Sequence, residues 1–142
     1  MKNVKLTFPN EGTKTTFIVS VKTEEGPYRN AWFRFKFFIP DDWPETIPRV
    51  RAIDKIWHPN IQEVDENDPD SGNVHIAISP DEQNLSLSII VQGIIFILNH
   101  PDLNAALNVI AADEYRKDYE RFKNHVEELI DRYSYMKSSD DE

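Results

Sequence analysis

The 142-residue sequence contains no cysteine. This absence excludes a disulfide framework, a thiolate zinc site and a cysteine nucleophile within the chain. Long hydrophobic runs are absent as well, because the longest one, residues 88–98, is shorter than the roughly 20 residues that span a bilayer. We therefore expect neither thiol chemistry nor a membrane-spanning segment.

Positively charged residues are fewer than negatively charged ones. The chain has 16 Lys and Arg against 25 Asp and Glu, and its formal net charge is −9. That balance argues against nucleic acid or an anionic membrane as the main ligand. Because no signal-peptide core follows Met1, we expect a cytoplasmic location, with the nucleus as an alternative. The length fits one domain over residues 1–135, followed by a disordered acidic tail over 136–142.

The first half of the sequence predicts strands. Apolar and polar residues alternate, or aromatic and β-branched residues gather, in four segments: 4–8, 17–22, 32–39 and 50–53. In the third segment Phe33, Phe35 and Phe37 fall on one side, whereas Arg34 and Lys36 fall on the other. Since antiparallel sheets can leave one face in water, this pattern predicts a four-stranded antiparallel meander.

The second half predicts helices. Residues 87–98 are apolar on nearly every side, which predicts a buried helix with Ser86 or Ser88 as its N-cap. From Tyr115 to Tyr133 apolar residues recur at steps of three and four, the spacing of a single helical stripe. Strands followed by helices are typical of the α+β class.

The most specific motif is His58-Pro59-Asn60. Its surroundings agree with one family: a Gly-x-Tyr turn at residues 26–28, a proline-containing loop at 43–50, and an apolar helix with Gly93. Together these features resemble the ubiquitin-conjugating enzyme family over about Val4 to Tyr133. Residues 55–61 are most similar to the branch that conjugates ubiquitin-like modifiers. The resemblance implies a UBC-like fold in which the meander packs on C-terminal helices and the family's amino-terminal helix is missing.

The resemblance also implies thioester chemistry, yet the residue that would carry it is different here. The family's cysteine follows a Gly-x-Ile/Val run, and in this chain Gly72-Asn73-Val74 is followed by His75. An acyl-imidazole hydrolyses readily and is a poor carrier of an activated C-terminus. The counterpart of Asn60 in the family stabilises an oxyanion, which would not form without the thioester. We expect a degenerate site at His75, beside a structural His58-Pro59-Asn60 motif, with no metal or cofactor.

The resemblance therefore implies a catalytically inactive ubiquitin-conjugating-enzyme variant that acts by binding. Its expected partners are an active conjugating enzyme, with which it could form a heterodimer, or a ubiquitin-like protein. Partner contact is predicted at Trp43, Pro44, Glu45 and Pro48, in the loop where ligase-binding members of the family hold their ligases. Two alternatives remain: a conjugating enzyme whose cysteine is replaced by His75 in this copy, and an adaptor domain outside conjugation.

Overall fold

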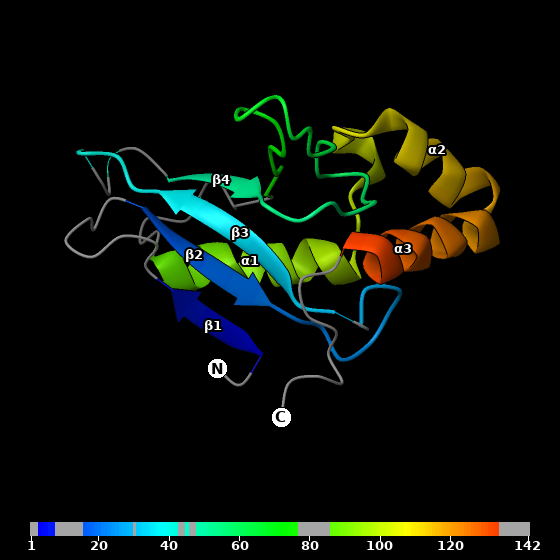
Figure 1. The fold of residues 1–142 in the computed structure, drawn as a ribbon, viewed down its shortest axis with the longest axis horizontal. Helices are drawn as coiled ribbons and strands as arrows, with labels where there is room; N and C mark the ends of the chain where they lie inside the picture. Colours follow the sequence, from blue (N-terminus) through cyan, green and yellow to red (C-terminus); the bar gives the residue numbers. More distant parts are fainter. Residues whose placement is uncertain are drawn as a thin grey trace.

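The computed structural model describes residues 3–7, 16–29, 31–42, 45, 48–76 and 86–133 (Figure 1). Its elements are β1 (Val4–Thr7), β2 (Thr16–Val21), β3 (Phe33–Phe38), β4 (Arg49–Ala52), α1 (Leu87–Asn99), the 3-10 turn η1 (Leu103–Ala105), α2 (Val109–Lys117) and α3 (Tyr119–Tyr133). The strands form one antiparallel sheet in the order β1-β2-β3-β4. The predicted α+β meander is confirmed, and β1 is the first element of the described part.

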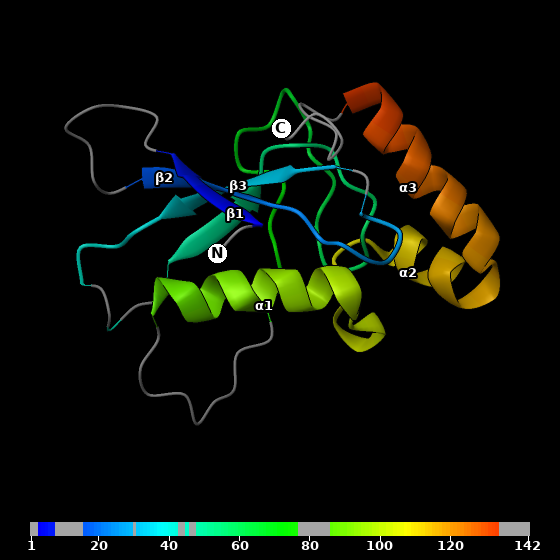
Figure 2. The same cartoon turned by 90° about the horizontal axis from the view of Figure 1, so that it is seen from below.

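The sheet buries one face against α1. The cross-strand pairs Phe17–Phe37 and Val19–Phe35 lie in register, and all four side chains are buried. The rings of Phe17 and Phe37 stack with their centroids 5.1 Å apart. Figure 2 shows α1 lying across this face of the sheet, and its buried Ile90, Ile94 and Ile97 belong to the same core. The alternation of aromatic and polar residues in β3 therefore decides which face of the sheet becomes the core.

Helix α1 begins where the sequence predicts, but only one side of it is buried. Of the two cap candidates, Ser86 is the N-cap, and its hydroxyl accepts a hydrogen bond from the Ile89 N–H at 3.2 Å. The prediction of burial on nearly every side is wrong, because Phe96 is 57% exposed. A helix that lies on a single sheet keeps an outer side in solvent, where the Phe96 ring contacts the ring of His100. None of the described helices is long and apolar enough to cross a membrane.

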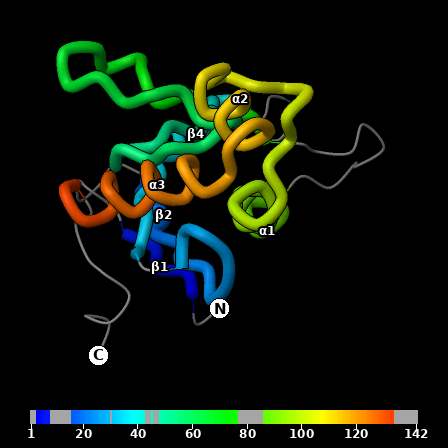
Figure 3. Tube along the Cα trace, turned by 90° about the vertical axis from the view of Figure 1, so that its right-hand side faces the viewer, coloured from blue at the N-terminus to red at the C-terminus, as the bar shows by residue number. Residues whose placement is uncertain are grey.

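The single stripe predicted from Tyr115 to Tyr133 is divided between two helices. Helix α2 ends at Asp118, whose backbone leaves the helical region at φ −152°. Asp118 ends α2 by donating its N–H to the Glu114 carbonyl, and its carboxylate begins α3 by accepting the Arg121 N–H. Figure 3 shows α2 and α3 beside each other, with α1 seen end-on. The break lets α3 turn back and bury Phe122, Val126 and Ile130 in the core.

Candidate functional site

The segment that carries His75 lies between the edge of the sheet and the His-Pro-Asn motif. On one side the Ala52 N–H donates to the Gly72 carbonyl at 2.7 Å, so residue 72 continues the sheet beyond β4. On the other side the His75 N–H donates to the Asn60 carbonyl at 2.9 Å. Backbone hydrogen bonds thus fix both borders of this segment, and the motif and His75 become neighbours although 15 positions separate Asn60 from His75.

Gly72 is required where the segment leaves the acidic loop. Its φ is +82°, and a Cβ built on it would lie 2.6 Å from the Ala52 carbonyl oxygen. Both the left-handed backbone and the close approach exclude a side chain here. The geometry therefore explains why a glycine stands at the start of the Gly-x-Ile/Val run. Gly72 turns the chain so that the next three residues run along the motif.

His58 is buried in one protonation state that its neighbours define. Its Nδ1 accepts the Asn60 backbone N–H at 2.9 Å, so the ring proton lies on Nε2 and is donated to the Ile97 carbonyl at 2.6 Å. Burial lowers the pKa of His58 to about 4, although the bond to Ile97 acts in the opposite direction. The neutral ring ties the motif to α1, as expected for a structural residue.

Asn60 uses its whole amide to hold the loop after α1. Its Nδ2 donates to the carbonyls of Asp102 at 2.8 Å and Ala105 at 3.1 Å, and its Oδ1 accepts the Asp102 N–H at 2.8 Å. Both amide protons have acceptors within the chain, and Asn60 is fully buried. In this arrangement the side chain has no proton left to offer an oxyanion.

Pro59 completes the attachment of this loop. Its carbonyl accepts two backbone N–H groups, from Leu107 at 2.8 Å and from Asn108 at 3.0 Å. Asn108 then caps α2 by accepting the Ala111 N–H at 3.0 Å. The three residues of the motif therefore position α1, the 102–108 loop and the start of α2, which makes the motif the junction of the second half of the fold.

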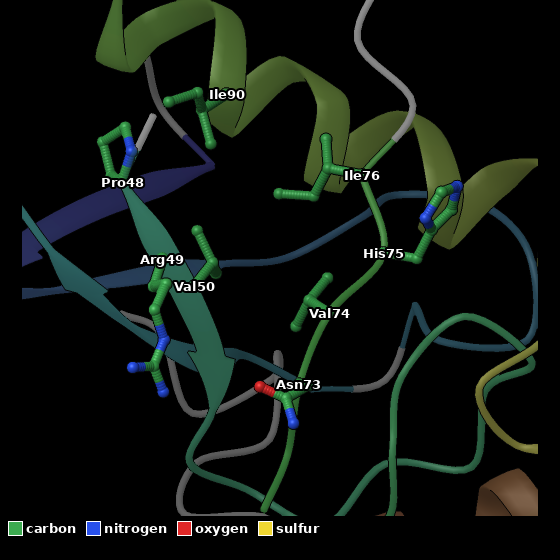
Figure 4. A pocket seen from close by; sticks show the side chains of 8 residues that line it. All are labelled: Pro48, Arg49, Val50, Asn73, Val74, His75, Ile76 and Ile90. Atoms are coloured by element: carbon green, nitrogen blue, oxygen red, sulfur yellow. The ribbon is translucent and has the colours of Figure 1, made fainter. Parts of the chain in front are cut away.

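His75 itself borders an open pocket of about 290 Å³ (Figure 4). The pocket is lined by Pro48, Arg49 and Val50 at the sheet edge, by residues 73–76, and by Ile90 of α1. Figure 4 shows His75 at the end of the pocket away from Arg49. The half-buried imidazole makes no hydrogen bond within the described part of the chain. The position can hold an imidazole, but none of the carboxylates that the structure describes forms a hydrogen bond with it that would orient it as a general base.

Of the four predicted partner-binding residues, the structure describes two. Trp43 and Pro44 lie outside the described residues. Glu45 is exposed in the connection between β3 and β4, whereas Pro48 is buried in the wall of the pocket beside β4. Within the described ranges no group of acidic, His or Cys side chains is arranged to hold a metal ion.

Sequence reasoning missed one partly buried polar cluster behind the motif. Glu114 of α2 accepts the indole N–H of Trp57 at 3.0 Å and contacts Nδ1 of His125 in α3 at 2.8 Å. The rings of Trp57 and His125 lie 4.6 Å apart. No local pattern marks Glu114, because Trp57 and His125 are 57 and 11 positions away; its third partner, Arg121 of α3, pairs with it at 3.4 Å. The cluster fixes α2 and α3 against the motif.

Comparison with known proteins agrees with this geometry. A family model described as ubiquitin-conjugating enzyme matches residues 2–130. The NEDD8-conjugating enzyme ubc-12 of Caenorhabditis elegans is 33% identical over 124 residues, which cover 81% of this chain and 65% of that protein. The NEDD8-conjugating enzyme UBE2F of Homo sapiens is 31% identical over an alignment of 142 residues. The alignment covers 92% of this chain and 71% of that protein.

The chain spans about two thirds of the length of these relatives. The matched region includes the sheet, the His-Pro-Asn motif and α1 to α3 almost to its end, so the similarity is not confined to one motif. The relatives also agree with the predicted branch, because NEDD8 is a ubiquitin-like modifier. The chain belongs to the ubiquitin-conjugating enzyme family, and the relatives named above are NEDD8-conjugating enzymes.

Proposed function

We propose that this chain is a non-catalytic variant of the family that acts by binding in the conjugation of a ubiquitin-like modifier. The observation that carries the proposal is the pairing of an intact framework with a missing nucleophile. His58 and Asn60 make hydrogen bonds that support the neighbouring backbone. His75 nevertheless stands where the family resemblance places the cysteine, and the sequence has no other cysteine to replace it.

Thioester exchange needs a thiolate that accepts the acyl group at little cost and releases it to an amine. An imidazole at position 75 lacks this balance, because the acyl group would be lost to water before an amine could take it. The framework nevertheless retains the shape of a conjugating enzyme. A domain that keeps this shape without the chemistry can still hold a modifier or an active conjugating enzyme.

The names of the relatives suggest which modifier to test first. Those proteins are named as NEDD8-conjugating enzymes, so NEDD8 and an active NEDD8-conjugating enzyme are the first partners of choice. Ubiquitin is the necessary comparison, because the family model is described by that modifier. A cytoplasmic location, with the nucleus as an alternative, is part of the proposal.

The test is an NMR titration of the isotope-labelled chain with NEDD8, with ubiquitin and with an active NEDD8-conjugating enzyme. We expect at least one of them to shift a contiguous set of backbone amides with a dissociation constant below about 1 mM. A ubiquitin-sized protein from outside the modifier family serves as the control and is expected to shift none. The absence of shifts with all three partners would contradict the proposal.

A further inference from the structure

The face of the sheet that α1 does not cover is basic, although the chain as a whole is acidic. In register, Lys36 of β3 lies opposite Arg51 of β4, and Phe38 lies opposite Arg49. Their side chains point away from the core, because the residues between them, Phe35, Phe37 and Val50, are buried against α1. No described helix covers this side in Figure 2. We call Lys36, Phe38, Arg49 and Arg51 the basic sheet face.

Three cations of the basic sheet face surround one half-buried ring. The charged groups of Lys36, Arg49 and Arg51 lie 5.4, 5.7 and 5.4 Å from the centroid of Phe38. Each contact is a weakly favourable cation–π interaction. Like charges directly opposite each other on two strands, as Lys36 and Arg51 are, destabilise a sheet. An anion placed between them would remove that repulsion.

The cations are only partly neutralised. Arg51 donates to the Pro69 carbonyl at 2.6 Å and pairs with Asp70 at 3.0 Å, but its buried Nε has no hydrogen-bond partner. Neither Lys36 nor Arg49 forms an ion pair with any residue that the structure describes. Positive charge at Lys36 and Arg49 therefore remains available on this face.

A pocket of about 210 Å³ adjoins the ring. It lies between Lys36, Phe38 and Arg51 on the sheet side and residues 64–71 of the acidic loop on the other side. Two of the loop carboxylates already accept backbone N–H groups of the loop itself, at Asn67 and Asp70. The sheet wall of the pocket is thus cationic and aromatic. The volume of the pocket suits a single side chain.

We propose that the basic sheet face binds a short acidic peptide segment of another protein, with a carboxylate placed beside an apolar side chain. The carboxylate would lie between Lys36 and Arg49, and the apolar group would pack on Phe38. The site is separate from the pocket at His75, and the inference stands whether or not the chain acts in modifier conjugation.

Charge at the borders favours a short peptide over nucleic acid. Asp41, Asp42 and Glu45 follow β3 at one border, and the loop over residues 62–73 lies at the other. A long polyanion would meet these carboxylates on both sides and would be repelled by the net charge of −9. A segment with one or two carboxylates fits between the borders.

The test uses a capped peptide of glutamates around one phenylalanine, titrated into the isotope-labelled chain at low salt. We expect shifts confined to the amides of β3, β4 and the neighbouring loop, and weaker binding as salt is raised. Combining Lys36→Glu with Arg49→Glu should weaken binding at least about tenfold, since two surface ion pairs are lost. The control combines Lys117→Glu with Arg132→Glu, which changes the net charge equally and should leave binding unchanged.

The inference is overturned by equal binding of the same peptide with glutamine in place of glutamate, by equal or tighter binding of single-stranded oligothymidine, or by shifts away from β3 and β4. Equal weakening by the control pair would also overturn it, because net charge alone would then explain the binding. The spectrum of each variant verifies its fold. The neutral pair Lys36→Gln and Arg49→Gln repeats the measurement with less repulsion, and it too should bind more weakly than the unchanged chain.

Discussion

Replacing Asn60 with alanine is expected to lower the free energy of unfolding by about 3 kcal/mol, because it leaves buried backbone groups without partners. The wild-type amide makes three hydrogen bonds to the 102–105 segment. After the substitution the Asp102 N–H and the carbonyls of Asp102 and Ala105 lose these bonds. Urea denaturation at neutral pH measures the loss.

Asn73 supplies the matched control for this experiment. The side-chain amide of Asn73 makes two hydrogen bonds, to the side chain of Gln62 and to the Asp70 carbonyl, but Asn73 is exposed, unlike Asn60. Water can replace those partners, so Asn73→Ala should cost less than about 1 kcal/mol. If Asn60→Ala and Asn73→Ala cost the same, Asn60 is not the structural junction described above.

Acidification from pH 7 to pH 5 is expected to remove about 2 kcal/mol of stability through His58 alone. Burial lowers its pKa from 6.5 to about 4 in the folded chain. Between those values the unfolded chain binds the proton and the folded chain does not. The contribution of His58 is therefore fully present above pH 6.5 and is lost as the pH falls toward 4. Protonation would also place a second N–H against the Asn60 N–H.

Chemical denaturation at the two pH values measures this loss of stability. The control is His100→Gln, at an exposed position on the end of α1, which should lose as much stability between pH 7 and pH 5 as the unchanged chain does. In His58→Asn the part of the pH-dependent loss that comes from His58 should be absent, whatever the stability of that variant at pH 7. Nitrogen NMR of the unchanged chain provides an independent readout, in which the His58 ring should remain the neutral Nε2–H tautomer at pH 6. A ring already half protonated at pH 6 would contradict the account.

The strands could be predicted because their pattern is local. In β3 the alternation of Phe33, Phe35 and Phe37 with Arg34 and Lys36 identifies both faces of the sheet, and the structure places each side chain accordingly. The order of the strands followed from the short connections between them. Helix α1 was located correctly for the same reason, since its apolar run and its Ser86 cap lie within one segment.

The break at Asp118 could not be predicted from the stripe. Apolar spacing continues through it, and only the capping bonds of Asp118 with Glu114 and Arg121 reveal two helices. The exposure of Phe96 was missed because hydrophobicity does not state how many sides of a helix have a neighbour. The packing of α1 on the sheet, from which it is distant in sequence, decided the exposure of Phe96.

The site was predictable only in its parts. The motif and His75 were identified by resemblance. That they lie side by side in the fold depends on the backbone hydrogen bond from His75 to Asn60. The attachment of Asn60 to Asp102 and Ala105 spans more than forty positions and leaves no periodic pattern. The basic sheet face was visible in sequence as the polar side of β3, but the opposition of Lys36 and Arg51 required the register.

The central claim is that His75 cannot carry an activated modifier. The most direct measurement incubates the unchanged chain with NEDD8, its activating enzyme and ATP, and reads intact mass under non-reducing conditions. A known active NEDD8-conjugating enzyme is the positive control, and His75→Cys asks whether the framework alone suffices. We expect no stable adduct on the unchanged chain, because an acyl-imidazole hydrolyses readily, and none on His75→Cys. NEDD8 covalently bound at His75 and passed on to an amine would contradict the account.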